Sequence, residues 1–133
     1  LNIAYKDTIK DIDESIGKLV SGNVMEVLGS FYNSIPLELN VKLTPLNKDF
    51  QKINITPVNQ IINAGAKDGS AVKTNLSLKL EDPSDLLKDL RAFQLDFSAK
   101  SNETVAGAPI KPENFVKADL RLKLKGGINI KNK

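Results

Sequence analysis

Few residues in this chain could carry chemistry, because it contains no histidine, cysteine or tryptophan. Ser-His-Asp and Cys-His arrangements are therefore excluded, as are zinc sites built on imidazole or thiolate ligands. General acid–base catalysis would fall to carboxylates, lysines or tyrosines, and two carboxylates suffice for glycoside hydrolysis. The acids Glu38, Asp96 and Asp119 alternate with apolar neighbours, so we expect them on exposed strand faces. The sequence thus predicts a protein that is not an enzyme, with no metal site and no cofactor.

Two short clusters have some features of ligand-binding loops but lack others. Asp11, Asp13 and Glu14 form the densest acidic group, yet the glycine and the further oxygen ligands of a calcium loop are missing. Residues 65–69 begin and end with glycine but lack the Gly-Lys-Ser/Thr ending of a phosphate loop. We interpret the first cluster as a solvated helix face and the second as a surface hairpin loop.

A basic stripe on the last long strand is the best candidate for a contact surface. Its alternating cations could meet an anionic glycan, a lipid headgroup or an acidic neighbouring domain. They could equally protect an edge strand from aggregation, which is the interpretation that we prefer. Tyr5, Tyr32 and Phe50 are the aromatic residues expected to be exposed, whereas Phe115 is expected in the core. The predicted contact patch comprises Lys117, Arg121, Lys123, Lys125, Tyr5, Tyr32 and Phe50.

The elements that would position these residues are mostly strands. From residue 116 to residue 125, apolar and charged residues alternate strictly, which is typical of a strand with one buried and one exposed face. Similar patterns predict about seven strands, over residues 24–32, 35–44, 53–63 with a break at Pro57, 72–81, 93–99, 116–125 and 128–130. One-sided burial favours antiparallel pairing, and the regular turn signals are compatible with a sandwich or a barrel.

Two segments are predicted to be helical. Apolar residues recur at three- and four-residue steps from Ile9 to Val20, which indicates a helix in residues 1–22. The sequence Asp-Pro-Ser-Asp at 82–85 predicts the start of a short connecting helix that ends near Leu90. We therefore expect a mainly β protein, an antiparallel β-sandwich with an N-terminal helix and one short connecting helix.

The chain has the size of one domain, with 133 residues and a net charge of +3. We expect residues 1–22 to be a helical segment, 23–130 the β-domain and 131–133 a tail. Acids and bases interleave along the sequence, so no nucleic-acid partner is predicted. No apolar run is long enough to span a bilayer, and any membrane attachment would come from an anchor outside this sequence.

The order of the strand segments resembles a known group of proteins. The segments are 31–43, 62–65, 86–99, 105–109 and the closing Leu-Arg-Leu-Lys-Leu-Lys-Gly-Gly at 120–127. Together they are similar to the C-terminal β-region of uncharacterised secreted or surface lipoproteins from Bacteroidetes. The resemblance implies a location at the cell envelope or outside the cell, within a larger exported polypeptide.

From these patterns we expect a non-enzymatic structural or interaction module, and the resemblance implies that it lies at the cell surface. Its partner would be a protein or another envelope component, including an upstream domain of the same chain. The alternative is a domain that binds a glycan at an exposed Tyr5, Tyr32 or Phe50 beside polar groups, or an apolar, lipid-like molecule between its aliphatic sheet faces.

Overall fold

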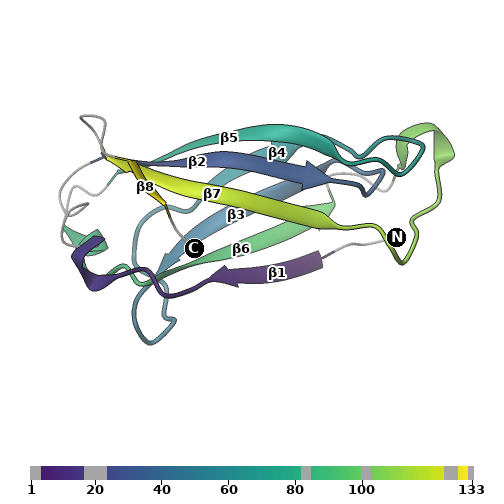
Figure 1. The fold of residues 1–133 in the computed structure, drawn as a ribbon. Coiled ribbons are helices and arrows are strands. Elements are labelled where there is room, and N and C mark those ends of the chain that lie inside the picture. Colours follow the sequence, from purple (N-terminus) through teal and green to yellow (C-terminus); the bar gives the residue numbers. More distant parts are fainter. Residues whose placement is uncertain (1–3, 17–23, 82–84, 100–102, 125–128, 132–133) are drawn as a thin grey trace.

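Two four-stranded antiparallel sheets pack face to face in the computed structural model (Figure 1). The structure describes residues 4–16, 24–81, 85–99, 103–124 and 129–131. One sheet has the order β1-β6-β3-β4, and its strands are β1 (Ala4–Ile9), β6 (Ala92–Ala99), β3 (Leu39–Leu46) and β4 (Val58–Ile62). The other has the order β5-β2-β7-β8, and its strands are β5 (Val72–Glu81), β2 (Val24–Asn33), β7 (Val116–Leu124) and β8 (Asn129–Lys131). The predicted antiparallel β-sandwich is confirmed.

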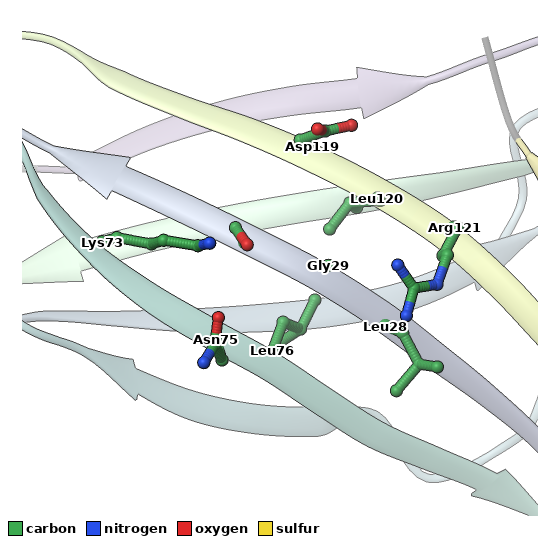
Figure 2. Close-up of a pocket in the computed structure, with 9 residues that line it drawn as sticks. Leu28, Gly29, Lys73, Asn75, Leu76, Asp119, Leu120 and Arg121 are labelled. Carbon is green, nitrogen blue, oxygen red and sulfur yellow. The ribbon is translucent and has the colours of Figure 1, made fainter.

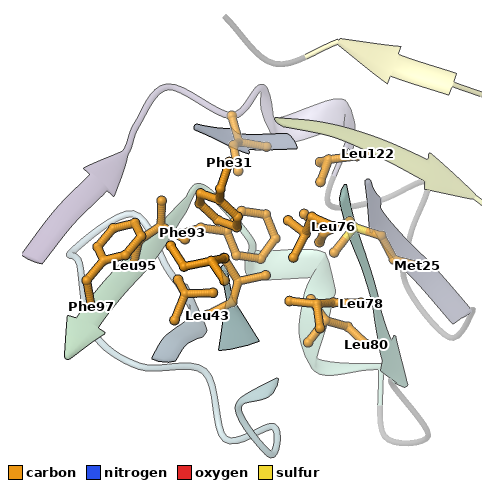
Figure 3. Packing of buried hydrophobic residues seen from close by; sticks show 14 of the residues in the cluster. Met25, Phe31, Leu43, Leu76, Leu78, Leu80, Phe93, Leu95, Phe97 and Leu122 are labelled. Atoms are coloured by element: carbon orange, nitrogen blue, oxygen red, sulfur yellow. The ribbon is translucent and has the colours of Figure 1, made fainter. Parts of the chain in front are cut away.

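The core lies between the inner faces of the two sheets (Figure 3). Strand β5 shows the cause most clearly, because Leu76, Leu78 and Leu80 are buried while the residues between them are exposed. Phe31 of β2 meets Phe97 of β6 edge to face, with ring centroids 5.7 Å apart. Aliphatic side chains fill most of the remaining space, so the interior is held together chiefly by the burial of leucine, isoleucine and valine.

The helix predicted for residues 1–22 is wrong over its first part. Ala4–Ile9 form β1, which pairs with β6 from Ala4 opposite Ser98 to Ile9 opposite Phe93. Asp11 then takes a left-handed backbone conformation, with φ of 63°, and this bend ends the extended segment. Only residues 14–16 are helical in the described part of this region, and 17–23 lie outside it. Hydrogen bonding to the edge of β6 determined the structure of this segment, although the local spacing of apolar residues indicated a helix. The helix-like spacing begins at the end of β1 and continues into the turn that follows it.

Three smaller predictions also need correction. Residues 35–38 and 53–55 are not strands but parts of connections, although Leu37 and Ile53 are buried. The short helix after Pro83 is a single 3-10 turn, η1 (Leu86–Asp89), preceded by Asp85 in a left-handed conformation. The predicted cap, Asp82, lies outside the described residues.

Phe115, predicted for the core, is 47% exposed. It comes just before β7, and its carbonyl oxygen accepts a hydrogen bond from the Ser34 N–H at 2.9 Å. Its N–H donates to the Ser34 hydroxyl at 2.7 Å. The same segment carries the second 3-10 turn, η2 (Val105–Gly107). These bonds fix the backbone of Phe115 at the end of the sandwich, where the ring faces solvent.

A buried polar pair, Asn33 and Ser34, ties the connections together at this end of the sandwich. The Nδ2 of Asn33 donates to the carbonyl oxygens of Leu37 and Asn63, both at 3.0 Å. The N–H of Gly65 donates to the carbonyl oxygen of Ile35 at 2.7 Å. A Cβ at Gly65 would lie 2.4 Å from the carbonyl carbon of Ser34, so only glycine fits there. The β2–β3, β4–β5 and β6–β7 connections therefore share one anchor.

Candidate functional site

A shallow depression of about 540 Å³ lies on the outer face of the β5-β2-β7 part of the second sheet (Figure 2). Lys73 and Asn75 border it from β5, and Asp119 and Arg121 border it from β7. The strand period puts these four side chains on the face opposite the core. Ser30 and its neighbours on β2 line the middle. In Figure 2, the Lys73 amine and the Arg121 guanidinium both extend from their own strands toward β2.

The strand register places cations on both sides of β2. Lys73 and Lys117 are opposite Tyr32, one on each neighbouring strand. Six residues away along β2, Lys79 and Lys123 are in the same way opposite Glu26. We call the outward side chains Lys73, Lys79, Lys117, Arg121 and Lys123 the cationic face.

The charge of the cationic face is only partly balanced. Glu26, Glu81 and Asp119 are the acids on the same side of the sheet, so cations outnumber them there. Within residues 4–16, 24–81, 85–99, 103–124 and 129–131, none of these cations lies within ion-pairing distance of a carboxylate. The ion pair that the structure describes, Arg91 with Glu14 at 4.0 Å, is elsewhere. The face therefore presents positive charge to solvent.

Gly29 lets β2 and β7 approach closely beneath the depression. Its φ is +153°, and a Cβ there would lie 2.0 Å from the carbonyl oxygen of Asp119. A residue with a side chain would push the strands apart or change their twist. Glycine inside a strand often marks such a close approach, and this was a signal available in the sequence.

The predicted contact patch is only partly assembled in one place. Tyr32, Lys117, Arg121 and Lys123 share the outer face of the second sheet. Phe50 lies apart from them, in the turn after β3, 55% exposed and with the Lys10 Nζ 5.8 Å from its ring centroid.

Two members of the predicted patch cannot be placed fully. The backbone of Tyr5 is opposite Phe97 in the β1–β6 ladder, but its side chain lies outside the described part, as does Lys125. β8 pairs with β7 from Arg121 to Lys123. Arg121 and Lys123 therefore do not lie on an edge strand, and the interpretation that they protect such an edge is wrong for these two residues.

Sequence reasoning missed the β5 side of the site. The alternation of β5 indicated that Lys73 and Asn75 point outward, but the order of strands in the sheet was not predicted. Only the pairing of both β5 and β7 with β2 brings Lys73 near Arg121.

The described residues show little that resembles a catalytic centre. No group of three or more of His, Cys, Asp and Glu is placed to hold a metal ion among them. A smaller hollow of about 320 Å³ brings Asp49 and Asp89 together with Arg91. Both carboxylates are exposed and come from surface turns, unlike the enclosed apolar site in which a carboxylic acid catalyst works.

Comparison with known proteins supports the fold. No protein-family model and no curated protein matches the chain. A solved structure described as a "putative secreted protein" from Parabacteroides distasonis ATCC 8503, a member of the Bacteroidetes, superposes with a TM-score of 0.75 at 17% sequence identity. The match covers 95% of this chain but only 38% of that protein. The chain therefore has the fold of one part of that longer bacterial protein.

No helix in the described part is both long and apolar enough to cross a membrane.

Proposed function

We propose that this chain is a non-enzymatic interaction module of an exported polypeptide, and that the cationic face contacts an anionic partner. The observation that carries the proposal is the set of unpaired cations on both sides of β2. Export and a place at the cell envelope or outside the cell are supported by the likeness to a protein described as secreted and by the resemblance to Bacteroidetes surface lipoproteins.

A cationic sheet face suits contact with an acidic protein surface. The side chains project from hydrogen-bonded strands, so their Cα positions are fixed before a partner arrives, which lowers the entropic cost of binding. Charges of this kind speed association and select partners of opposite sign. An acidic domain of the same polypeptide or another envelope protein would provide such a surface.

The depression favours a second candidate, an acidic glycan. Lys73 and Arg121 could bind a carboxylate or a sulfate, since both are unpaired and border the hollow. The Ser30 hydroxyl and the Asn75 amide would provide hydrogen bonds to sugar hydroxyls.

An apolar ligand has less support. That function needed a sheet curled around an N-terminal helix, whereas this segment forms β1, a strand at the edge of the first sheet. The inner faces pack against each other, with Leu39, Val41 and Leu43 of β3 all at 1% exposure or less. The space between the sheets is filled by the protein's own side chains.

Affinity electrophoresis in gels containing heparin or polygalacturonate would test the cationic face. We expect both polymers to retard the protein, and we expect the double variant Lys73→Gln/Arg121→Gln to weaken the retardation at least tenfold. The matched control, Lys52→Gln/Lys111→Gln, removes the same charge from exposed residues in the connections, so its effect should be less than twofold.

The comparison of these variants also separates the two candidates. If free galacturonate competes with polygalacturonate, the depression itself binds the acidic sugar; if only the polymers bind, the whole face acts as an electrostatic surface. Equal weakening in both double variants would show that net charge alone is responsible, and the proposal would fail.

A further inference from the structure

We infer that the edge of β7 between Val116 and Leu120 accepts an additional β-strand from a partner chain. β8 pairs with β7 only from Arg121 to Lys123, and no other described strand pairs with this side of β7. An unpaired edge presents N–H and C=O groups that can template another strand. This inference goes beyond the proposed function, because it concerns the backbone edge of β7 rather than contact with an anionic partner, although Lys117 belongs to both surfaces.

The hydrogen-bond pattern shows which groups of β7 face this edge. The Ser34 N–H donates to the Phe115 carbonyl oxygen at 2.9 Å, so the β2–β7 bonds involve the odd-numbered residues on the β7 side. Residues in an antiparallel strand alternate between one neighbour and the other. The N–H and C=O groups of Ala118 and Leu120 therefore point away from β2, toward the side of β7 on which no described strand pairs with them.

The opposite edge of the same sheet is closed by the chain itself. The Gln60 side chain, from β4 of the other sheet, donates its Nε2 to the Asn75 carbonyl oxygen at 2.7 Å. Its Oε1 accepts from the Ser77 N–H at 3.4 Å. Nearby, the Asn63 N–H donates to the Thr74 hydroxyl at 2.8 Å. These bonds occupy β5 where another strand would otherwise pair, and the described part of β7 has no equivalent.

The inward side chains of β7 are also less buried than those of β5. On β5, Leu76 and Leu80 are only 3% and 1% exposed. On β7, the inward residues Val116, Ala118 and Leu120 pack against the core but are only half-buried. A strand added beside β7 would cover this remaining apolar surface, which adds a hydrophobic gain to the new ladder.

The exposed charges of β7 specify the chemistry of the added strand. Directly opposite residues in an antiparallel pair share a face. We therefore expect an acidic residue opposite Lys117 and a basic residue opposite Asp119, with apolar residues opposite Ala118 and Leu120. Because the partner runs antiparallel, its order is apolar, basic, apolar, acidic. The occupant is thus an extended segment of another polypeptide with this alternation.

Amide hydrogen exchange of the whole chain, followed by NMR, would test the inference with the synthetic peptide acetyl-Val-Lys-Val-Glu-Val-Ser, which ends before Arg121, where β8 already pairs. In the free protein, the amides of Ala118 and Leu120 should exchange at least tenfold faster than those of Lys117 and Asp119. Saturating peptide should slow the first pair at least tenfold. Methylation of the valine nitrogens that face β7 should abolish the effect, whereas methylation of the lysine and glutamate nitrogens should preserve it.

A charge exchange provides a second measurement that does not depend on backbone chemistry. Lys117→Glu should weaken the peptide about fivefold, and exchange of the peptide glutamate for lysine should restore binding. Lys111→Glu, in the preceding connection, should change the affinity neither for the original peptide nor for the peptide in which lysine replaces glutamate. Slow exchange of Ala118 and Leu120 without peptide would show that the chain itself fills the edge. That result, or equal loss of binding with both methylated peptides, would overturn the inference.

Discussion

Replacement of Gly29 by alanine would test the close approach of β2 and β7 under the depression. The added Cβ would lie 2.0 Å from the Asp119 carbonyl oxygen and 3.0 Å from the Leu120 Cα. Both are backbone atoms, so no side-chain rotation can relieve the overlap. The two strands would have to separate by at least about 1 Å to reach the 3.0 Å below which real Cβ contacts are essentially never seen.

The expected cost follows from that separation. A ladder bond of ordinary length that is stretched by about 1 Å passes the limit of about 3.2 Å for a good N–H···O bond. Loss of two or three such bonds costs about 1 kcal/mol each. Alanine at a φ of +153° adds about 1–3 kcal/mol of backbone strain. The total is about 3–6 kcal/mol, a large part of the roughly 7–20 kcal/mol expected for a chain of this length.

Urea unfolding followed by far-UV circular dichroism would measure this cost, and Gly69→Ala is the matched control. Gly69 also has a positive φ, +90°, but a Cβ there would meet nothing within 4 Å. We expect the control to lose only about 1–2 kcal/mol, from backbone strain alone. If the two variants unfold with the same free energy within about 0.5 kcal/mol, well below one ladder bond, the reasoning on the β2–β7 approach is refuted.

Three further predictions concern stability and protonation. Leu95→Ala and Leu122→Ala, each at a side chain only 2% exposed, should each lower the free energy of unfolding by about 2–5 kcal/mol in urea titrations; losses below about 0.5 kcal/mol at both sites would mean that the inward faces are misassigned. Thr44→Val should raise it by about 1 kcal/mol, because the buried Oγ1 of Thr44 hydrogen-bonds to no described residue; a loss of stability would contradict this. Hydrogen bonds from the Ser70 hydroxyl and N–H lower the pKa of the Asp68 carboxyl below 3.8, so their contribution to stability is present above the unfolded pKa and is lost as the pH falls through the folded pKa. An NMR titration should find the lowered midpoint, and Ser70→Ala should return it toward 3.8; an unchanged midpoint would refute this cause.

The fold was largely predictable because one-sided burial leaves a direct mark on the sequence. Strand β5 has the predicted limits, 72–81, and β2 extends one residue beyond the predicted end. β7 agrees with the prediction from 116 to 124, after which the predicted Lys125 lies outside the described residues. The N-terminal strand was not predictable in the same way. Its residues have no strict alternation, and they are extended because the edge of β6 provides a ladder. That cause is a tertiary contact, which a local pattern does not contain.

The candidate site was predictable only on one strand. The cations of β7 follow directly from its alternation, but Lys73 joins them through the pairing of β5 and β7 with the same central strand. Phe50 was grouped with them by its exposure alone, and it lies in the turn after β3. Exposure can be judged residue by residue, whereas proximity across a sheet depends on the strand order.

The anchor formed by Asn33 and Ser34 limits how this protein can diverge. Three connections that are distant in sequence are bonded to the same two residues, through the Leu37 and Asn63 carbonyls and the Phe115 backbone. An insertion between an anchor point and its strand would shift all three connections together, so it should be selected against. Changes in length should instead accumulate at the outer tips, such as the exposed residues 67–70 and 111–113. Homologues are thus expected to vary in those tips while this end of the sandwich keeps its geometry.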